Sequence, residues 1–192
     1  IVRKNGKYVF FGGRTQEVEK RTKVKARIVA QSLEELISET DRVMIMGHSN
    51  PDMDVMGAAL GIYRLAKEMG KEVFIVNQNT TIGIEHFLAE ARKESEYQIA
   101  FIDKLEALAK INADTLLVVV DTNKKDYVEI PELLGETNKI IVIDHHRRST
   151  DYIEEAILTF QEVYASSACE LVTEILEYAE TQPILKTIEV EG

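Results

Sequence analysis

Three short apolar runs, each followed at once by side chains that can bind metal ions, constrain this chain most. The runs cover residues 43–46, 116–120 and 140–143. Continuous apolar runs of this length are typical of strands that are buried on both faces of a parallel sheet. Because the carboxyl ends of parallel strands meet at one edge of the sheet, we expect the polar residues that follow them to lie together.

The polar residues after the three runs are imidazoles and carboxylates. They are His48, Asp52 and Asp54 after the first run, Asp121 after the second, and Asp144, His145 and His146 after the third. Taken singly, an aspartate in a turn or a histidine in a loop needs no function. Three strands that end this way favour a shared metal site, and mixed nitrogen and oxygen ligands suit manganese, zinc or iron better than calcium.

The rest of the chain alternates between strand and helix patterns, which predicts an α/β fold. The expected architecture is a doubly wound, Rossmann-like, mainly parallel sheet flanked by helices. Further elements are predicted as helices over 54–69, 84–93, 103–110 and 168–180, strands over 71–76 and 99–101, and a turn-rich connection over 126–134. Gly57, Ala58 and Gly61 are small and would let the first core helix approach the sheet closely.

Length and composition indicate a globular chain with one sizeable core. It has 192 residues, 45% hydrophobic residues and a net charge of −10. No apolar run is long enough to cross a membrane, and no signal peptide is evident. The single cysteine, Cys169, excludes an internal disulfide and fits a reducing compartment.

The first 40 residues differ from the rest. Residues 1–13 contain a hairpin pattern around Asn5-Gly6, which we interpret as the end of an upstream domain. Residues 14–40 are interpreted as a linker and a helix, and the domain proper as 41–192. The basic stretch 20–25 suggests either a nucleic-acid contact or a solvated linker, and we favour the linker. The helix over 26–38 should pack beside the first strand through one apolar face: Ile28, Val29, Leu33, Leu36 and Ile37.

The segments GHSNPDMD, VVVDTN and IDHH resemble the first three motifs of the DHH phosphoesterase superfamily. The resemblance covers about residues 42–180. It implies two Mn²⁺ ions, with His48 and Asp52 on the first, Asp54 and His145 on the second, and Asp121 bridging both.

The same resemblance implies roles for residues near the ions. His146 would reach the scissile phosphate, and Asp144 would orient a histidine. Ser167 fits a helix capping box with Glu170, and the superfamily places a serine-rich element near the phosphate, so Ser166 and Ser167 could serve both purposes. Arg147 and its neighbour Arg148 could bind phosphate or face water, and the sequence leaves both readings open.

A fourth superfamily motif, another strand that ends in aspartate, is not found after Glu180. The domain over 41–192 is therefore expected to stop before that motif. On this interpretation, residues 1–192 alone would hold the second metal poorly and would be weakly active or inactive.

The junction FGGRTQEVEK, at residues 11–20, resembles that of GdpP-type cyclic-di-AMP phosphodiesterases, where a degenerate GGDEF domain precedes the DHH domain. This implies a cytoplasmic domain of a membrane-anchored bacterial protein that hydrolyses cyclic di-AMP, a cyclic dinucleotide, to the linear dinucleotide. No duplex nucleic acid is expected as a partner, and a homodimer is left open. The alternatives are an oligoribonuclease or single-strand exonuclease, less favourably a pyrophosphatase, and a catalytically silent nucleotide-sensing module.

Overall fold

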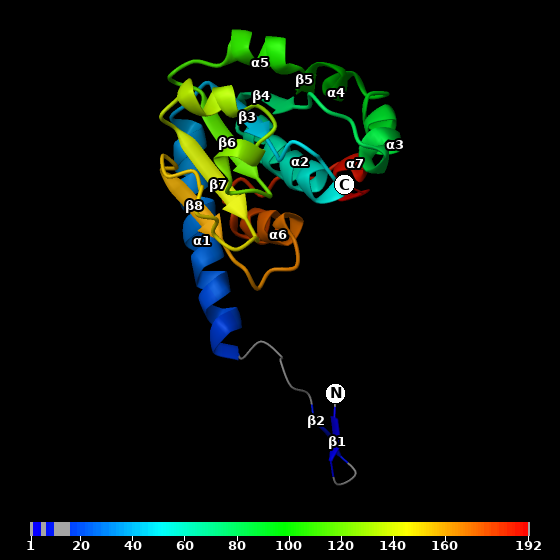
Figure 1. Ribbon diagram of the computed structural model, residues 1–192, viewed down its shortest axis with the longest axis vertical. Helices are drawn as coiled ribbons and strands as arrows, with labels where there is room; N and C mark the ends of the chain where they lie inside the picture. Colours follow the sequence, from blue (N-terminus) through cyan, green and yellow to red (C-terminus); the bar gives the residue numbers. More distant parts are fainter. Residues whose placement is uncertain (1, 5–6, 10–15, 192) are drawn as a thin grey trace.

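A six-stranded parallel sheet forms the centre of the molecule, as the computed structural model shows in Figure 1. The structure describes residues 2–4, 7–9 and 16–191, with side chains described over 23–190. The strands lie in the order β5-β4-β3-β6-β7-β8, and each neighbouring pair is parallel. Their bounds are β3 (Arg42–Met46), β4 (Glu72–Val76), β5 (Phe101–Ile102), β6 (Leu116–Val120), β7 (Ile140–Asp144) and β8 (Leu158–Gln161).

This strand order confirms the predicted doubly wound fold. The chain starts in the middle of the sheet at β3, moves outward through β4 to β5, and then returns to β6 on the other side of β3. The connections after β3 and β6 therefore leave in opposite directions. In such sheets the crevice at this reversal, outside the carboxyl ends of the strands, is where ligands bind.

Successive side chains of the central strands enter two separate apolar cores. Val43 and Ile45 pack on one face of the sheet, while Met44 and Met46 pack on the other. The first face is covered by α1 (Gln16–Ser38), α2 (Met53–Glu68), α3 (Ile82–Ala91), α4 (Ser95–Ala100), α6 (Ala168–Tyr178) and α7 (Thr187–Glu191). The second face has a thinner cover: α5 (Lys104–Lys110), the short 3-10 helix η2 (Pro131–Gly135), and Val128 and Ile130 of the segment that follows the 3-10 helix η1 (Lys125–Tyr127).

At the amino end, β1 (Val2–Lys4) pairs with β2 (Lys7–Val9) in an antiparallel hairpin. The predicted turn at Asn5-Gly6 lies outside the described residues. That this segment closes an upstream domain stays a prediction. None of the helices in the described ranges is long and apolar enough to cross a membrane.

The apolar face predicted for the first helix was wrong at one position. Ile28 is 61% exposed, and the buried stripe of α1 is Ala26, Val29, Ala30, Leu33 and Ile37. The helix packs chiefly against α6 rather than beside the first strand. Lys25, from the basic stretch, donates from Nζ to the carbonyl of Gln161 at 3.0 Å and pairs with Glu162, so its charge is used inside the domain.

The strand predicted over 99–101 was also misplaced. The chain is helical to Ala100 in α4, and β5 covers only Phe101–Ile102. Ile99 is 72% exposed, while Tyr97 and Ala100, one helical turn apart, are buried. Helix α3 begins at Ile82 instead of residue 84. Strand β8 was not predicted, because its half-buried edge sequence LTFQ lacks a continuous apolar run.

Gly61 serves helix packing, and not the approach to the sheet that the sequence suggested. A Cβ atom at Gly61 would lie 2.5 Å from Cγ1 of Val172 on α6. The missing side chain therefore lets α2 and α6 pack closely, and the amino ends of the two helices also meet, where the amides of Ala168 and Cys169 donate to Asp54.

Candidate metal centre

The residues after β3, β6 and β7 meet at the carboxyl edge of the sheet, because these three strands are neighbours. Asp121 lies at the centre, directly after β6, and is only 3% exposed. Its backbone has a φ of 57°, in the left-handed region, and its amide donates to the carbonyl of Ile143 at 2.9 Å. Aspartate and asparagine tolerate this conformation better than most side chains do.

One oxygen of Asp121 belongs to a cluster with residues that follow β3. His48 Nε2 lies 3.3 Å from Asp121 Oδ2 and 3.8 Å from Asp52 Oδ2. One ligand atom from each of these three side chains can be chosen so that all lie within 4.8 Å of one another. Asp52 is also the N-cap of α2, since its Oδ1 accepts from the amides of Asp54 and Val55.

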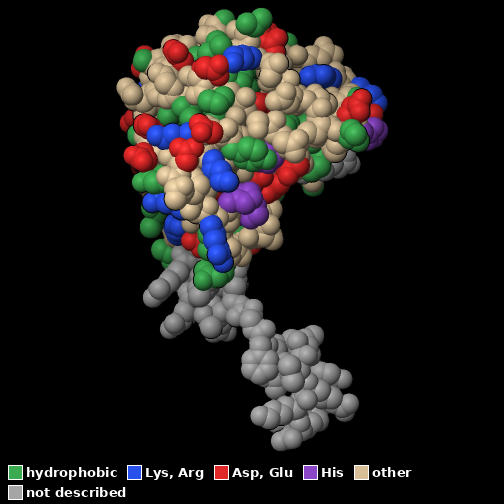
Figure 2. Space-filling view, viewed as in Figure 1, with side chains coloured by type: hydrophobic (Ala, Val, Ile, Leu, Met, Phe, Trp, Pro, Cys, Tyr) green, Lys and Arg blue, Asp and Glu red, His purple; other side chains and the backbone are tan. Residues whose placement is uncertain are grey.

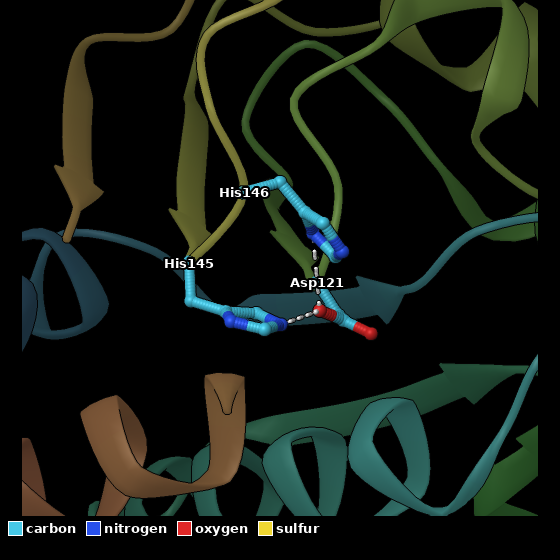
Figure 3. A group of neighbouring side chains, drawn as sticks. All are labelled: Asp121, His145 and His146. Carbon is cyan, nitrogen blue, oxygen red and sulfur yellow. Dashed lines mark ion pairs between the residues drawn. The ribbon is translucent and has the colours of Figure 1, made fainter. Parts of the chain in front are cut away.

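The other oxygen of Asp121 faces the two histidines that follow β7 (Figure 3). His145 Nε2 lies 3.3 Å and His146 Nδ1 lies 3.5 Å from Asp121 Oδ1. These three residues form a second group of potential ligands. A single buried carboxylate therefore lies between two sets of metal-binding side chains.

Asp54 lies at the rim of these clusters. It is in the first turn of α2, which begins at Met53, one residue before the helix predicted over 54–69. Its carboxylate accepts from the amides of Ala168 and Cys169 at 2.8 Å each, at the amino end of α6. Asp54 Oδ2 is also 3.6 Å from His145 Nε2. The carboxylate thus faces both the start of α6 and the second cluster.

Asp144 contacts a histidine directly. It is fully buried, and its Oδ1 lies 2.8 Å from His146 Nδ1 and accepts from the His146 amide at 3.2 Å. Its other oxygen accepts from the side-chain amide of Asn123. These contacts restrict how the His146 ring can turn.

Ser166 and Ser167 hold the start of α6. The Ser167 hydroxyl accepts from the Glu170 amide at 3.0 Å, as the predicted cap requires. The Glu170 side chain, however, accepts from the amide and the hydroxyl of Ser166, at 2.6 Å each. The capping box is therefore only half formed, and its returning bond goes one residue earlier than predicted.

A pocket of about 420 Å³ adjoins the second cluster. Its lining is polar and partly basic: Asp121, Thr122, Asn123, Lys124, Tyr127, His146 and Arg147. The neighbouring Arg148 instead lies over the ring of Tyr152, 4.2 Å from its centroid. On the molecular face in Figure 2, a histidine patch is exposed between basic and acidic side chains. An anion could reach the clusters from this side.

Three residues of the site were missed from the sequence. Tyr127 stacks on the His48 ring with centroids 5.1 Å apart, Asn123 bonds to Asp144, and Glu129 is buried next to Val128, the bridge partner of His48. Asn123, two residues after Asp121, could have been suspected from VVVDTN. Tyr127 and Glu129 carry no local signal, since tertiary contacts alone bring them to the site.

His48 and Asp121 each shift the pKa of the other. Burial alone would lower the pKa of His48, but its hydrogen bond to Asp121 and the charges of Asp121, Asp52 and Glu129 outweigh that effect and raise the pKa. Burial raises the pKa of Asp121, and nearby Asp54 adds to the rise, against the opposing effect of His48. A positive ion would relieve this crowding of negative charge.

The donor set fits a divalent cation. Asp121 Oδ1 is buried and makes no hydrogen bond with the described residues, although a buried carboxylate oxygen normally has a partner. Imidazole nitrogens and carboxylate oxygens approach it from two sides. Such N/O sets suit transition metals of the manganese, iron and zinc kind.

Glu129 makes the stability of the metal-free fold depend on pH. Burial raises the pKa of this carboxyl group from 4.5 to about 7, against the opposing effects of the amides of Asn79 and Gln78 and the charge of His48. Between about 4.5 and about 7, the folded chain keeps a proton that the unfolded chain has lost. We therefore expect stability to fall as pH rises through this window, by about 3 kcal/mol in all.

Glu129→Gln cannot ionise and should remove this part of the pH dependence. Urea unfolding in EDTA, at a series of pH values, measures it for the wild type and the variant. Parallel stability curves for the two proteins would contradict the expectation.

The chain belongs to the DHH family: residues 42–190 match the family described as "DHH family, N-terminal domain". It is 46% identical to "Cyclic-di-AMP phosphodiesterase GdpP" of Geobacillus thermodenitrificans, over 96% of this chain and 28% of that protein. It is 38% identical to "Cyclic-di-AMP phosphodiesterase PdeA" of Listeria monocytogenes, over 98% of this chain and 28% of that protein. The chain thus spans little more than a quarter of the length of these relatives.

A solved structure shares the fold. It is described as an exopolyphosphatase-related protein from Bacteroides fragilis, with a TM-score of 0.66 and 21% identity, over 82% of this chain and 44% of that one. At this identity the likeness concerns the fold alone.

Proposed function

We propose that this chain is the catalytic domain of a metal-dependent phosphodiesterase that hydrolyses cyclic di-AMP to the linear dinucleotide. The observation that carries the proposal is the position of Asp121, whose two oxygens face separate clusters of histidine and carboxylate. The names of the two relatives, which align with nearly all of this chain, support the choice of reaction and substrate.

Two Mn²⁺ ions would be held by five side chains. His48 and Asp52 would hold one ion, Asp54 and His145 the other, with Asp121 shared between them. When bound, such a pair of ions supplies a hydroxide near neutral pH and neutralises charge on the phosphate. Asp54 must then face an ion while it accepts the amides of α6, and its 3.6 Å distance from His145 is compatible with both.

The remaining polar residues would place the substrate. His146, held by Asp144, projects beside the pocket and would contact the scissile phosphate. Arg147 lines the same pocket and can bind a phosphate through two parallel hydrogen bonds. Ser166 and Ser167 lie at the start of α6, where both hydroxyls bond to Glu170, and they would approach the phosphate from that position.

The resemblance of residues 11–20 to the GdpP-type junction also suggests where the protein acts. We infer a membrane-anchored parent protein whose catalytic part faces the cytoplasm. Its partner would be a cyclic dinucleotide and not duplex nucleic acid. A homodimer stays open, since each of the two groups of potential ligands in the described residues comes from one chain.

Hydrolysis assays with the native protein, at its natural length, test the proposal. We expect cyclic di-AMP to be converted to the linear dinucleotide when Mn²⁺ is present, and EDTA to stop turnover until Mn²⁺ is restored. Short RNA and pyrophosphate are the comparison substrates. Faster turnover of either would reassign the substrate, and binding of cyclic di-AMP without turnover would indicate a sensing module.

A further inference from the structure

One buried nitrogen of the site lacks a partner. His48 turns Nε2 toward Asp121 and Asp52, which leaves Nδ1 as its other ring nitrogen. Nδ1 is buried and makes no hydrogen bond with the described residues. When Nε2 of an imidazole binds a metal ion, Nδ1 carries the proton and must donate. The site therefore needs an acceptor behind His48.

Glu129 offers a matching buried acceptor. Its Oε1 accepts from the amides of Gln78 at 2.7 Å and Asn79 at 2.8 Å, while Oε2 is buried and makes no hydrogen bond with the described residues. Glu129 is one residue from Val128, which pairs with His48 in an antiparallel bridge, and the two side chains are close enough for the charge of each to shift the pKa of the other. In the same ladder, the Glu129 amide donates to the carbonyl of Gly47 at 3.0 Å.

We propose that Glu129 is a positioning residue that accepts the Nδ1 hydrogen of His48, across one buried water or after a small movement of the Glu129 side chain, and so keeps Nε2 free for a metal ion. The inference rests on the proposed function, in which His48 is a ligand. A carboxylate behind a metal-binding histidine fixes both the tautomer and the orientation of the ring. Buried carboxylate and imidazole atoms without partners are otherwise costly to a fold.

The position requires a carboxylate because both of its oxygens must accept. In Glu129→Gln, the single amide oxygen would stay with the amides of Gln78 and Asn79. The side-chain NH₂ group would then face His48 and donate to Nδ1. This favours the tautomer with the proton on Nε2, which donates to Asp121 and cannot bind an ion.

A purely structural role for Glu129 predicts a different result. Glu129 anchors the loop after β4, and Asn79 of that loop donates to the carbonyl of Ser49 at 3.1 Å. The glutamine variant keeps the oxygen that anchors this loop. If anchoring were its only role, the substitution would change neither the His48 tautomer nor metal affinity.

Nitrogen NMR and metal titration together test the inference. Long-range ¹H–¹⁵N spectra report which ring nitrogen is protonated, and His48→Gln identifies the signals among the four histidines. At a pH above 7, where Glu129 is ionised, we expect a protonated Nδ1 in the metal-free and zinc-loaded wild type, and an unprotonated Nδ1 in metal-free Glu129→Gln. The Mn²⁺ dissociation constant should rise about 10- to 100-fold in the variant. Glu132→Gln, at an exposed residue paired with Lys104, should change neither quantity.

Each other outcome counts against the inference. An unprotonated Nδ1 in the wild type overturns the inference by itself. The inference can therefore be tested even if the variant fails to fold. An unchanged tautomer, or a changed tautomer with unchanged Mn²⁺ affinity, also overturns it. A wild type that binds no Mn²⁺ overturns the proposed function instead, and the metal-free spectra still test the hydrogen bond to Glu129.

Discussion

Asp121→Asn should abolish the proposed hydrolysis of cyclic di-AMP while leaving the fold intact. The substitution removes the one charge that both clusters share, so Mn²⁺ should bind weakly at each of them. Loss of metal-assisted catalysis is worth several kcal/mol of barrier, so turnover should fall by about a thousandfold or more. Two measurements compare Asp121→Asn with the wild type in the protein of natural length. Calorimetric titration gives the affinity for Mn²⁺, and an assay with cyclic di-AMP gives the turnover.

Asparagine is the appropriate replacement because the φ of 57° at this position suits it almost as well as aspartate. Burial disfavours the charged form of Asp121, so the metal-free variant should be no less stable than the wild type. Asp114→Asn is the matched control, since the Asp114 side chain is 92% exposed and remote from the clusters. Retained turnover in Asp121→Asn would remove Asp121 from the metal site.

Gly47→Ala should be the most damaging small substitution for stability. A Cβ atom at Gly47 would lie 2.2 Å from Cγ1 and 2.9 Å from Cγ2 of Val55, a buried and rotationally stiff side chain at the start of α2. Overpacking of this kind costs about 1–3 kcal/mol, and we expect the upper end, with a Tm lower by about 10 °C. Because His48 follows directly, the affinity for Mn²⁺ should fall as well.

Thermal unfolding of two further variants separates the clash from the loss of glycine itself. Gly83→Ala in α3 makes the same change where the nearest atom is 3.8 Å away, and it should be neutral or stabilising by up to about 1 kcal/mol. Val55→Ala combined with Gly47→Ala should recover part of the loss. A Gly47→Ala protein with wild-type Tm would show that α2 can shift freely at this point.

The sheet and most of the site were predictable because their signals are local. Residues 116–120 form a continuous apolar run whose burial on both faces leaves few alternatives to a central strand. The meeting of His48, Asp121 and His145 followed from parallel strands sharing one edge. Strand β8 was missed because an edge strand with one half-buried face has a weaker pattern.

The errors concern features that depend on contacts between distant segments. Gly61 was assigned to the sheet, because the sequence does not show that α6 packs against that face of α2. Asp54 carries no sign that its carboxylate meets the amino end of α6, more than a hundred residues later. Glu129 is an ordinary glutamate until the loop after β4 folds over it.

Asp121 has a consequence for the order in which ions bind. Its two oxygens face different clusters, yet they share one negative charge. An ion in one cluster neutralises part of the Asp121 charge that would attract an ion to the other cluster. The same ion also fixes the positions of the carboxylates and imidazoles that surround it. The proposed pair of ions therefore cannot load as independent events, and the titration curve of this domain should depart from that of two separate sites.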